Sequence, residues 1–379
     1  MSVSPAVETI TSSLHRTWIE INLDRLRANL EVIKNRIRPT DHVMAVIKAN
    51  AYGHGMSDIA LALKNQVSFF GVSSVEEALR LQSQGITTPV FLFGALLKSE
   101  IPLVIKDGIH LSVSSYEEAE EMSRLSIEQG RVTPIHVKVD TGMGRLGIPL
   151  GDAIKVIERM VDLRGVFMEG IYTHFPSAEL KDGFTERQIQ DFTLLIKALE
   201  TKNIRFKYRH AANSAGIFNA PNEWLNLVRP GLMLYGLYPG ESLRAEASVN
   251  PVLSFKSRIL LIKRLMPGQS VGYGRTFMAD QPTFIATIGA GYSHGYPVAA
   301  SGKSFVIYNG QRYPVAGRVS MDYLAINLGD TRAKVGDEVT MIGEDSEAAV
   351  TAEELATITG TIPYEIVTRL PSSLPRVYR

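Results

Sequence analysis

Short apolar runs alternate with amphipathic segments along the first two thirds of the chain. Between these runs lie helical patterns, such as the segment after Ser74, which we expect to cap a helix, and the long segment 186–201. Eight runs have the length and the β-branched or aromatic content of buried strands: Val43–Lys48, Phe69–Val72, Pro89–Phe93, Ile109–Val113, Ile135–Asp140, Phe167–Thr173, Phe206–Ala211 and Trp224–Arg229.

Eight strand and helix units at spacings of roughly 20–40 residues match the number and spacing of units in a (β/α)₈ barrel. The pattern changes after about residue 245, where a long alternating segment, 254–265, is followed by a hairpin signal at Asn309-Gly310 and another strand at 338–342. We therefore expect an α/β barrel over residues 1–245 and a mostly β domain over 246–379. The alternating segment Thr17–Leu23 is an additional strand that would pair with the second domain.

Composition narrows the function classes. Hydrophobic residues make up 45% of the 379 and charged residues 21%, and 40 Lys+Arg balance 39 Asp+Glu to a formal charge of +1. A chain without a basic excess is not expected to bind nucleic acid. There is no cysteine, which suits a reducing compartment. The amino terminus lacks a secretory pattern and no apolar run reaches membrane-spanning length, so we expect a cytoplasmic protein without a membrane partner.

Polar and glycine-rich residues follow the predicted strands. Lys48 closes the first, and Asp140-Thr141-Gly142, Thr173-His174, Asn213-Ser214 and Arg229-Pro230-Gly231 follow later ones. Barrel enzymes place their chemistry at the carboxyl ends of the strands, where a desolvated lysine can form a Schiff base with an aldehyde. A solvated lysine at a strand end is the alternative for Lys48 alone.

Barrels often bind phosphate at the loops after strands seven and eight. Ser214, Gly231 and the backbone amide of Leu232 fit that role. A reactive lysine on one wall and a phosphate site on the opposite wall are what pyridoxal 5′-phosphate requires. No metal site is expected.

Seven segments in order along the chain carry a family resemblance. They are VIKANAYGHG at 46–55, KVDTGMGRLGI at 138–148, GIYTHF at 170–175, AANSA at 211–215, VRPGLMLYG at 228–236, VGYGRTF at 271–277 and GRVSMD at 317–322. Together they resemble the motif set of the alanine racemases. The resemblance implies a pyridoxal-phosphate enzyme that interconverts L- and D-alanine and supplies D-alanine for peptidoglycan.

The resemblance also implies residue roles. Lys48 would bind the cofactor covalently and act as one acid–base group, and Tyr273 would be the other. Tyr273 would reach into the partner subunit, so that each active site is shared across a homodimer. The remaining cofactor contacts would be Tyr52, His174, Asn213, Ser214, Arg229, Gly231, Leu232 and Tyr364. The substrate, a small amino acid, would meet Arg145 and, from the partner subunit, Met321 and Asp322.

Arg229 is the most informative of these residues. Many enzymes with this cofactor place a carboxylate at the pyridine nitrogen, whereas an arginine cannot accept a proton and leaves that nitrogen neutral. The weaker electron sink limits side reactions such as transamination. Tyrosine titrates near roughly 10, so Tyr273 needs nearby cations or donors to act as a base, and His174, Arg229 and Arg145 are the candidates.

Two features leave questions open. The family commonly reads GYADG followed by an arginine that helps to form the access corridor, whereas this chain has GYSHGYPV at 291–298 and retains only Arg318. Substrate breadth is therefore open, with a broader or serine-specific racemase as the alternative. The family lysine at the position of Lys138 is often carbamylated. An ion pair between an unmodified Lys138 and Asp140 is the other possibility.

Rival functions rest on weaker signals. The glycines at 142, 144 and 147 formally match a dinucleotide fingerprint, but Pro149 stands where its helix should run. A non-enzymatic cofactor-binding barrel would lack the second domain with Tyr273. A decarboxylase on the same scaffold would carry a cysteine near the substrate and a carboxylate in place of Arg229.

Overall fold

The computed structural model describes residues 15–220 and 223–379, so the sequence-based expectations for residues 1–14 lie outside the described residues. The chain forms two compact units. One contains Leu26–Tyr52 and Met56–Asn250 and is called the barrel unit below. The other contains Gly53–Gly55, Pro251–Arg379 and the described residues up to Arg25, and is called the β unit. Within the described ranges, no helix has the length and apolarity that crossing a bilayer requires.

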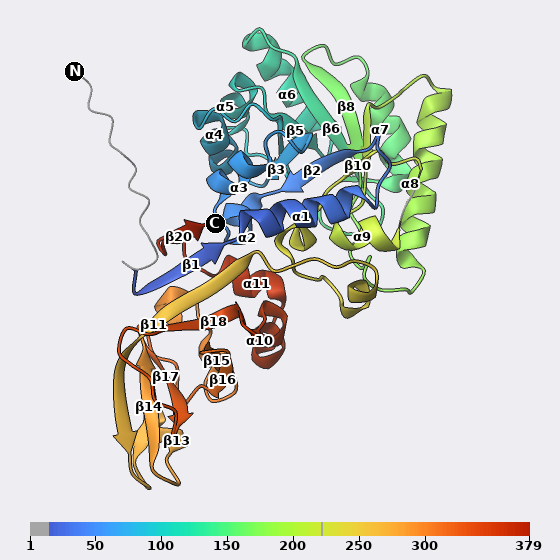
Figure 1. Cartoon of the computed structure of the whole chain (residues 1–379). Coiled ribbons are helices and arrows are strands. Elements are labelled where there is room, and N and C mark those ends of the chain that lie inside the picture. Colours follow the sequence, from blue (N-terminus) through green and yellow to red (C-terminus); the bar gives the residue numbers. More distant parts are fainter. Residues whose placement is uncertain (1–14, 221–222) are drawn as a thin grey trace, which may run out of the picture. The chain divides into compact units, whose positions relative to one another are not determined.

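The barrel unit is a ring of eight parallel strands among the described residues (Figure 1). Backbone hydrogen bonds from Asn226 N to Arg209 O (3.0 Å) and from Arg229 N to Ala212 O (2.9 Å) join the last strand to the one before it, and so close the ring. The predicted (β/α)₈ barrel is confirmed. Its strands are β2 His42–Val46, β3 Phe69–Val72, β4 Val90–Leu92, β5 His110–Val113, β6 Thr133–Asp140, β8 Val166–Tyr172, β9 Tyr208–His210 and β10 Leu227–Val228.

Helices follow the strands, as the alternating pattern predicts. Ser74 caps its helix as expected, because its side chain accepts the N–H of Glu77. After β10 the chain forms the 3₁₀ turns η3 Leu232–Tyr235 and η4 Glu241–Ala245 in place of a full helix. The helices are α1 Leu23–Lys34, α2 Lys48–Tyr52, α3 Met56–Leu63, α4 Val75–Ser83, α5 Ile101–Lys106, α6 Tyr116–Glu128, α7 Ala153–Met160, α8 Phe184–Thr201 and α9 Ser214–Asn219.

Aromatic side chains fill much of the barrel interior. The buried cluster consists of Met44, Phe69, Phe91, Tyr172, Tyr208 and Leu227. Two histidines, His136 and His210, have no exposed surface. Buried polar groups must find partners inside the protein, so this core combines apolar packing with specific hydrogen bonds.

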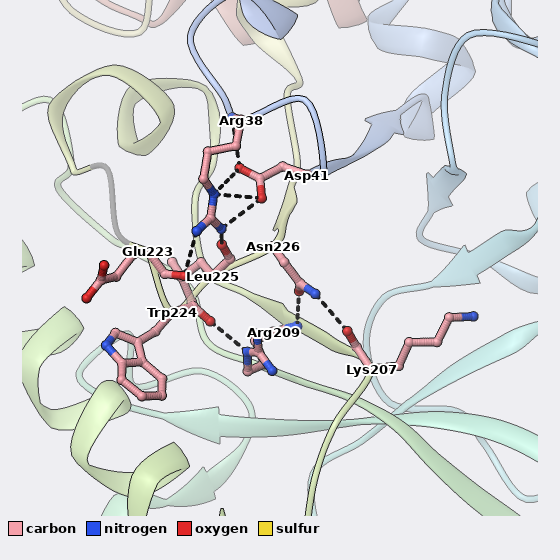
Figure 2. Close-up of polar contacts among 8 residues, drawn as sticks. All are labelled: Arg38, Asp41, Lys207, Arg209, Glu223, Trp224, Leu225 and Asn226. Atoms are coloured by element: carbon pink, nitrogen blue, oxygen red, sulfur yellow. Dashed lines mark hydrogen bonds and ion pairs between the residues drawn. The ribbon is translucent and has the colours of Figure 1, made fainter.

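A polar network ties the short strand β10 to its neighbours at the amino-terminal end of the barrel (Figure 2). Arg38 forms an ion pair with Asp41 at 2.8 Å and donates to the backbone carbonyl of Glu223 at 2.9 Å. The side chain of Asn226 accepts the N–H of Arg209 and donates to the carbonyl of Lys207, both at 2.8 Å. Because β10 has only two residues, these side-chain bonds supply pairing that the strand ladder lacks.

The β unit is built around the long strand β11 Leu253–Leu265, on which β1 Thr17–Ile21, β14 Thr283–Ile288 and β18 Glu338–Asp345 pair antiparallel. The predicted hairpin has Asn309 and Gly310 at φ 49° and 70°, as a two-residue turn of this kind requires. The other elements are β12 Ser270–Val271, β13 Phe277–Met278, β15 Phe305–Tyr308, β16 Gln311–Pro314, β17 Leu324–Gly329, β19 Ala348–Val350, β20 Arg376–Tyr378, α10 Ala352–Thr359 and α11 Pro363–Thr368.

The polar network beside β10 predicts that its side chains contribute to the stability of the fold. Asn226→Ala removes two hydrogen bonds and leaves the N–H of Arg209 in β9 and the carbonyl of Lys207 just before it without these partners. We therefore expect the free energy of unfolding to fall by about 2 kcal/mol. Urea unfolding at fixed protein concentration measures the change. Asn35→Ala, at an exposed position, is the matched control and should change the free energy by less than about 0.5 kcal/mol. Equal effects of the two substitutions would contradict the role given to Asn226.

Candidate active site

Lys48 begins a left-handed turn at the carboxyl end of the first barrel strand. The strand was expected to run to Lys48, but β2 ends at Val46 and α2 follows. The four residues after Lys48, from Ala49 to Tyr52, have φ between 51° and 54°. A left-handed conformation costs a non-glycine residue about 1–2 kcal/mol. This run of four is therefore strained and needs support, as strained backbone at functional sites does.

Glu77 supplies part of that support. Its Oε1 accepts the N–H of Ala49 at 2.6 Å and its Oε2 accepts the N–H of Ser73 at 2.9 Å. The side chain of Asn50 accepts the N–H of Met56 at 3.0 Å. These bonds hold the turn and thereby fix the position from which the Lys48 side chain extends.

Cationic side chains gather near Lys48. Burial lowers the pKa of Lys48, the charge of Arg145 lowers it further, and Glu77 opposes both. Burial also lowers the pKa of Lys138 to about 8, with the charges of Arg229, Arg145 and Lys48 adding to it against Asp140. A neutral amine and a bound anion are both favoured where positive charges accumulate in this way.

Arg229 is buried, with 4% of its surface exposed, and its hydrogen bonds go to neutral acceptors. One terminal nitrogen donates to the carbonyls of Thr173 and Ala211 at 2.8 and 2.9 Å, and the other donates to His210 Nδ1 at 2.8 Å. Because a guanidinium is planar, these bonds fix its orientation. Burial lowers the pKa of Arg229 to about 10, so it is charged at neutral pH.

His174 accepts a hydrogen bond from Arg229 and is not a cation, so of the two roles expected for it, cation or donor, that of a donor to other groups stays a prediction. Its Nδ1 lies 3.2 Å from a terminal nitrogen of Arg229, and an arginine can only donate. Burial and then the charges of Arg229, Lys138, Arg145 and Lys48 lower the pKa of His174 to about 3. At neutral pH the ring therefore carries its proton on Nε2, which is a donor.

Ser214, Gly231 and Tyr52, three residues predicted to contact the phosphate, lie close together and are called the cradle below. Ser214 Oγ accepts the N–H of Gly231 at 3.0 Å and that of Met233 at 3.3 Å. A Cβ atom on Gly231 would lie 2.5 Å from the hydroxyl oxygen of Tyr52. Only glycine allows the tyrosine to approach this closely. Leu232 is buried and begins η3 directly after the glycine.

Asn213 caps α9 and ties it to the preceding loop. Its side chain accepts the N–H of Gly216 at 2.9 Å and donates to the carbonyl of Phe175 at 3.2 Å. Asn213 therefore positions the helix that begins with Ser214. In this structure the side chain of Asn213 bonds to the backbone near Ser214 and thereby holds Ser214 in place.

The glycine-rich loop after β6 folds back on its own strand. The carboxylate of Asp140 accepts the backbone N–H groups of Gly142, Met143 and Gly144 at 2.8–3.1 Å. Ile148–Pro149 then forms β7, which pairs with β6, and α7 begins only at Ala153. No helix starts at these glycines, so the dinucleotide interpretation is wrong. The carboxylate of Asp140 thus holds the loop, and its charge also acts to raise the pKa of the nearby Lys138.

Tyr273 lies in the β unit on the turn between β12 and β13. It is in the 3₁₀ turn η5 Tyr273–Arg275, flanked by Gly272 and Gly274 at φ 73° and 72°. Its side chain is 73% exposed. It helps to line a cavity of about 400 Å³ with Arg318, Ser320 and Tyr323. A large, polar-tipped side chain exposed on a glycine-flanked turn is available to another surface.

Met321 and Asp322 are held by the segment that departs from the family pattern. Ser293 Oγ donates to the carbonyl of Met321 at 2.9 Å and to Asp322 Oδ1 at 3.1 Å. A Cβ atom on Gly291 would lie 2.5 Å from the same Met321 carbonyl. The segment therefore supports the two residues at close range. Tyr364, on α11 of the same unit, is half-buried.

Comparison with known proteins agrees with this geometry. The family model described as "Alanine racemase, N-terminal domain" matches residues 21–239, and "Alanine racemase, C-terminal domain" matches residues 252–378. The chain belongs to the alanine racemase family. It is 36% identical over 366 residues to alanine racemase 1 of Clostridium acetobutylicum, covering 95% of both chains.

Solved structures of alanine racemases have the same fold. The enzyme of Clostridium difficile 630 is 33% identical with a TM-score of 0.92, covering 97% of this chain and 96% of that one. That of Bacillus anthracis with bound L-Ala-P is 30% identical with a TM-score of 0.89, covering 96% of this chain and 95% of that one. The expected family membership is confirmed.

Three residues that support the site escaped the sequence-based expectations. Glu77 follows the expected Ser74 cap in the sequence and donates its N–H to it, but nothing in the sequence indicated that its side chain holds the Lys48 turn. His210 and Tyr172 were treated as strand residues, although His210 accepts from Arg229 and Tyr172 lies under it at 5.4 Å from ring centroid to guanidinium carbon. The sequence feature that could have indicated His210 and Tyr172 is a polar side chain at a position where the strand pattern predicts burial.

The neutral state of His174 has a measurable consequence for stability. An unfolded histidine titrates at its ordinary value of 6.5, whereas the folded pKa is about 3. As pH falls through this window the unfolded chain binds the proton first, so the free energy of unfolding should decrease. Urea unfolding at a series of pH values should therefore show a shallower loss for His174→Gln, which cannot take up the proton.

Histidine ring NMR gives the direct check. The His174 ring should show no protonation between about pH 5 and 7, where an ordinary histidine titrates. A His174 resonance with a midpoint in that range would contradict the assignment. An unchanged pH dependence of unfolding in His174→Gln would contradict it as well.

Proposed function

We propose that this chain interconverts L- and D-alanine with pyridoxal 5′-phosphate as its cofactor. The observation that carries the proposal is Lys48, an amine with a lowered pKa on a supported left-handed turn, in a chain that matches both alanine racemase domain models. The relatives are bacterial. In this proposal the protein works in the cytoplasm and supplies D-alanine for peptidoglycan.

The residues of the barrel unit fit the cofactor. In the cradle the hydroxyls of Ser214 and Tyr52 both lie against Gly231, which has no Cβ atom to keep them apart. In the proposal these residues, with Leu232 and Tyr364, hold the phosphate, while Lys48 Nζ binds the aldehyde carbon. When bound, the cofactor supplies the electron sink that makes the Cα–H of the amino acid acidic.

Arg229 would face the pyridine nitrogen. Its orientation is fixed by Thr173, Ala211 and His210. Because it only donates hydrogen bonds, it keeps that nitrogen unprotonated. His174, which is neutral, contacts the same terminal nitrogen of Arg229 that donates to Thr173 and Ala211, and it has a donor, Nε2–H, to offer within the site.

Racemisation needs acid–base groups on both faces of Cα. In the proposal Lys48 Nζ removes or returns the proton on one face. Tyr273 of the partner subunit does so on the other, which makes the enzyme a homodimer with shared sites. The 73% exposure of Tyr273 on its own subunit supports this role, since a catalytic base left in water would have no function there.

Substrate recognition would use Arg145 for the carboxylate and the partner's Met321 and Asp322 for the pocket wall. The exposed Arg145 contributes to the positive potential around Lys48 and Lys138. Lys138 suits carbamylation, because a pKa of about 8 leaves part of the amine neutral at physiological pH, which is the form that reacts with CO₂. The carbamate would place an anion beside Arg145.

Incubation with single L-amino acids and chiral chromatography tests the proposal. Protein loaded with pyridoxal phosphate should convert L-alanine to a racemic mixture and act less on L-serine and larger residues. Lys48→Ala should lose the near-visible absorption of the bound cofactor and at least about 10³-fold in rate. Formation of a keto acid or an amine without any D-isomer would overturn the proposal. Borohydride trapping of cofactor on another lysine would overturn the role of Lys48.

Subunit exchange tests the shared site. Lys48→Ala and Tyr273→Phe proteins should each be inactive, whereas a mixed dimer would have one site with both lesions and one intact site. With random exchange, half of the dimers are mixed, so about a quarter of the wild-type activity should return. Verified mixed dimers that recover no activity would show that both bases come from one chain.

A further inference from the structure

A line of polar side chains crosses the aromatic core of the barrel, starting at Arg229. Arg229 contacts His210 Nδ1 at 2.8 Å, and His210 Nε2 contacts His136 Nδ1 at 2.8 Å. His136 Nε2 in turn lies 3.8 Å from Glu169 Oε2. Both histidines are fully buried and Glu169 is 7% exposed. Nothing in the proposed reaction uses His136 or Glu169.

The proton positions along this line follow from Arg229. An arginine has only donors, so His210 Nδ1 must be bare and its proton must be on Nε2. His210 Nε2–H then donates to His136 Nδ1, which must also be bare. The remaining proton of His136 is therefore on Nε2, facing Glu169.

Glu169 independently favours the same arrangement. Its carboxylate lies 2.8 Å from His110 Nδ1 and 3.1 Å from Lys207 Nζ. Burial acts to raise the pKa of Glu169, but its contacts with His110, His136 and Lys207 outweigh burial and hold the pKa well below its usual range. The carboxylate is ionised and attracts the protonated nitrogen of His136. At 3.8 Å this attraction is electrostatic and not a direct hydrogen bond.

The surrounding rings leave little freedom for another arrangement. Tyr172 stacks on His210 with centroids 4.7 Å apart and an interplanar angle of 4°, and Phe91 lies 4.7 Å from His136. Packed rings cannot turn over without displacing their neighbours. Burial also lowers the pKa of His136 to about 4, so it stays neutral. What can vary is the nitrogen that carries each proton.

A metal ion at the end of the line is a competing explanation. His110, His136 and Glu169 offer ligand atoms within 4.8 Å of one another. A metal on His136 Nε2 would move the proton to Nδ1 and, through His210, would place an N–H against the N–H of Arg229. Two donors would then face each other in a buried site, which is unfavourable. The hydrogen bonds of Arg229 therefore argue against a metal.

We propose that Glu169 is a positioning residue for Arg229. Through His136 and His210, its negative charge selects the Nε2–H form of both rings, so that His210 always presents a bare nitrogen to the guanidinium. Without that charge only the contact with Arg229 opposes the other tautomer, so a fraction of His210 would turn a donor toward Arg229 and displace the guanidinium. The catalytic consequence rests on the proposed function, whereas the tautomer assignment does not.

The first test is ¹⁵N NMR of histidine-labelled protein, with and without pyridoxal phosphate. The chain has eight histidines, and His136→Gln and His210→Gln assign the two signals. Both rings should show a bare Nδ1 and a protonated Nε2. An Nδ1–H form or a charged ring at either position would overturn the proposal, and so would Zn²⁺-dependent shifts confined to His110 and His136.

The second test compares substitutions of Glu169. Glu169→Met should give mixed tautomers at His136 and His210 and lower kcat on the order of tenfold, a typical cost of losing an outer hydrogen-bonding partner, with KM nearly unchanged. Glu169→Gln keeps the size of the side chain but removes its negative charge, so it should give mixed tautomers and a lowered kcat as Glu169→Met does, whereas Glu169→Asp keeps the charge and should retain most of kcat. Lys207→Met removes the exposed partner of the carboxylate and should change kcat by less than about threefold.

The outcomes separate a positioning role from a structural one. If Glu169→Met were only destabilising, its melting temperature would fall while the tautomers and kcat of the folded protein stayed at wild-type values, and the proposal would fail. If Glu169→Met changes the tautomers of His136 and His210 but no amino acid is racemised by the wild-type protein, the proposed function fails while the role of Glu169 in selecting the tautomers is supported.

Discussion

The orientation of one buried guanidinium underlies the candidate site. Arg229 is removed from water, yet its partners are two backbone carbonyls and two neutral histidines, and no carboxylate of the described residues is in hydrogen-bonding contact with it. A buried charge of this kind is costly unless all the surrounding dipoles point toward it. The carboxyl ends of β8 and β9, next to the strand β10 that Arg229 follows, supply those dipoles, so the barrel geometry itself stabilises the cation.

Burial and positive charge at this end of the barrel explain the lowered pKa of three other groups. Lys48, Lys138 and His174 each have a lowered pKa for the same two reasons, burial and neighbouring positive charge. An excess of positive charge at the carboxyl end of the barrel favours anionic ligands and neutral amines together. A phosphate-bearing aldehyde and an amino-acid carboxylate are matched to both properties.

Structural support and chemistry are divided among different residues. Glu77, Asn213 and Ser293 touch the backbone beside Lys48, Ser214 and Met321, respectively, and each fixes a segment that carries a candidate site residue. Short polar side chains that bond to backbone groups are well suited to this task. The departure from the family pattern at 291–298 is thus a structural element of the β unit, whose Ser293 and Gly291 hold Met321 and Asp322 in place.

The sequence by itself determined the fold class and the set of site residues to consider. Strand periodicity, the Ser74 cap and the Asn309-Gly310 turn are local signals, and the structure agrees with them because each depends on neighbouring residues only. The seven motifs, read as a family resemblance, located Lys48, Ser214 and Arg229. Local patterns also marked Lys48 as the end of a strand, but they could not reveal the left-handed turn that follows it.

Tertiary structure alone decided how the site residues interact. Whether His174 is a cation or an acceptor depends on Arg229, which lies 55 residues away along the chain. The link between His136 and His210 spans 74 residues. Protonation states and tautomers in the core are set by such distant partners and by burial, and neither is encoded in a local pattern. The sequence could therefore name the chemical groups, while the folded barrel determined which of them donate, which accept and which carry charge.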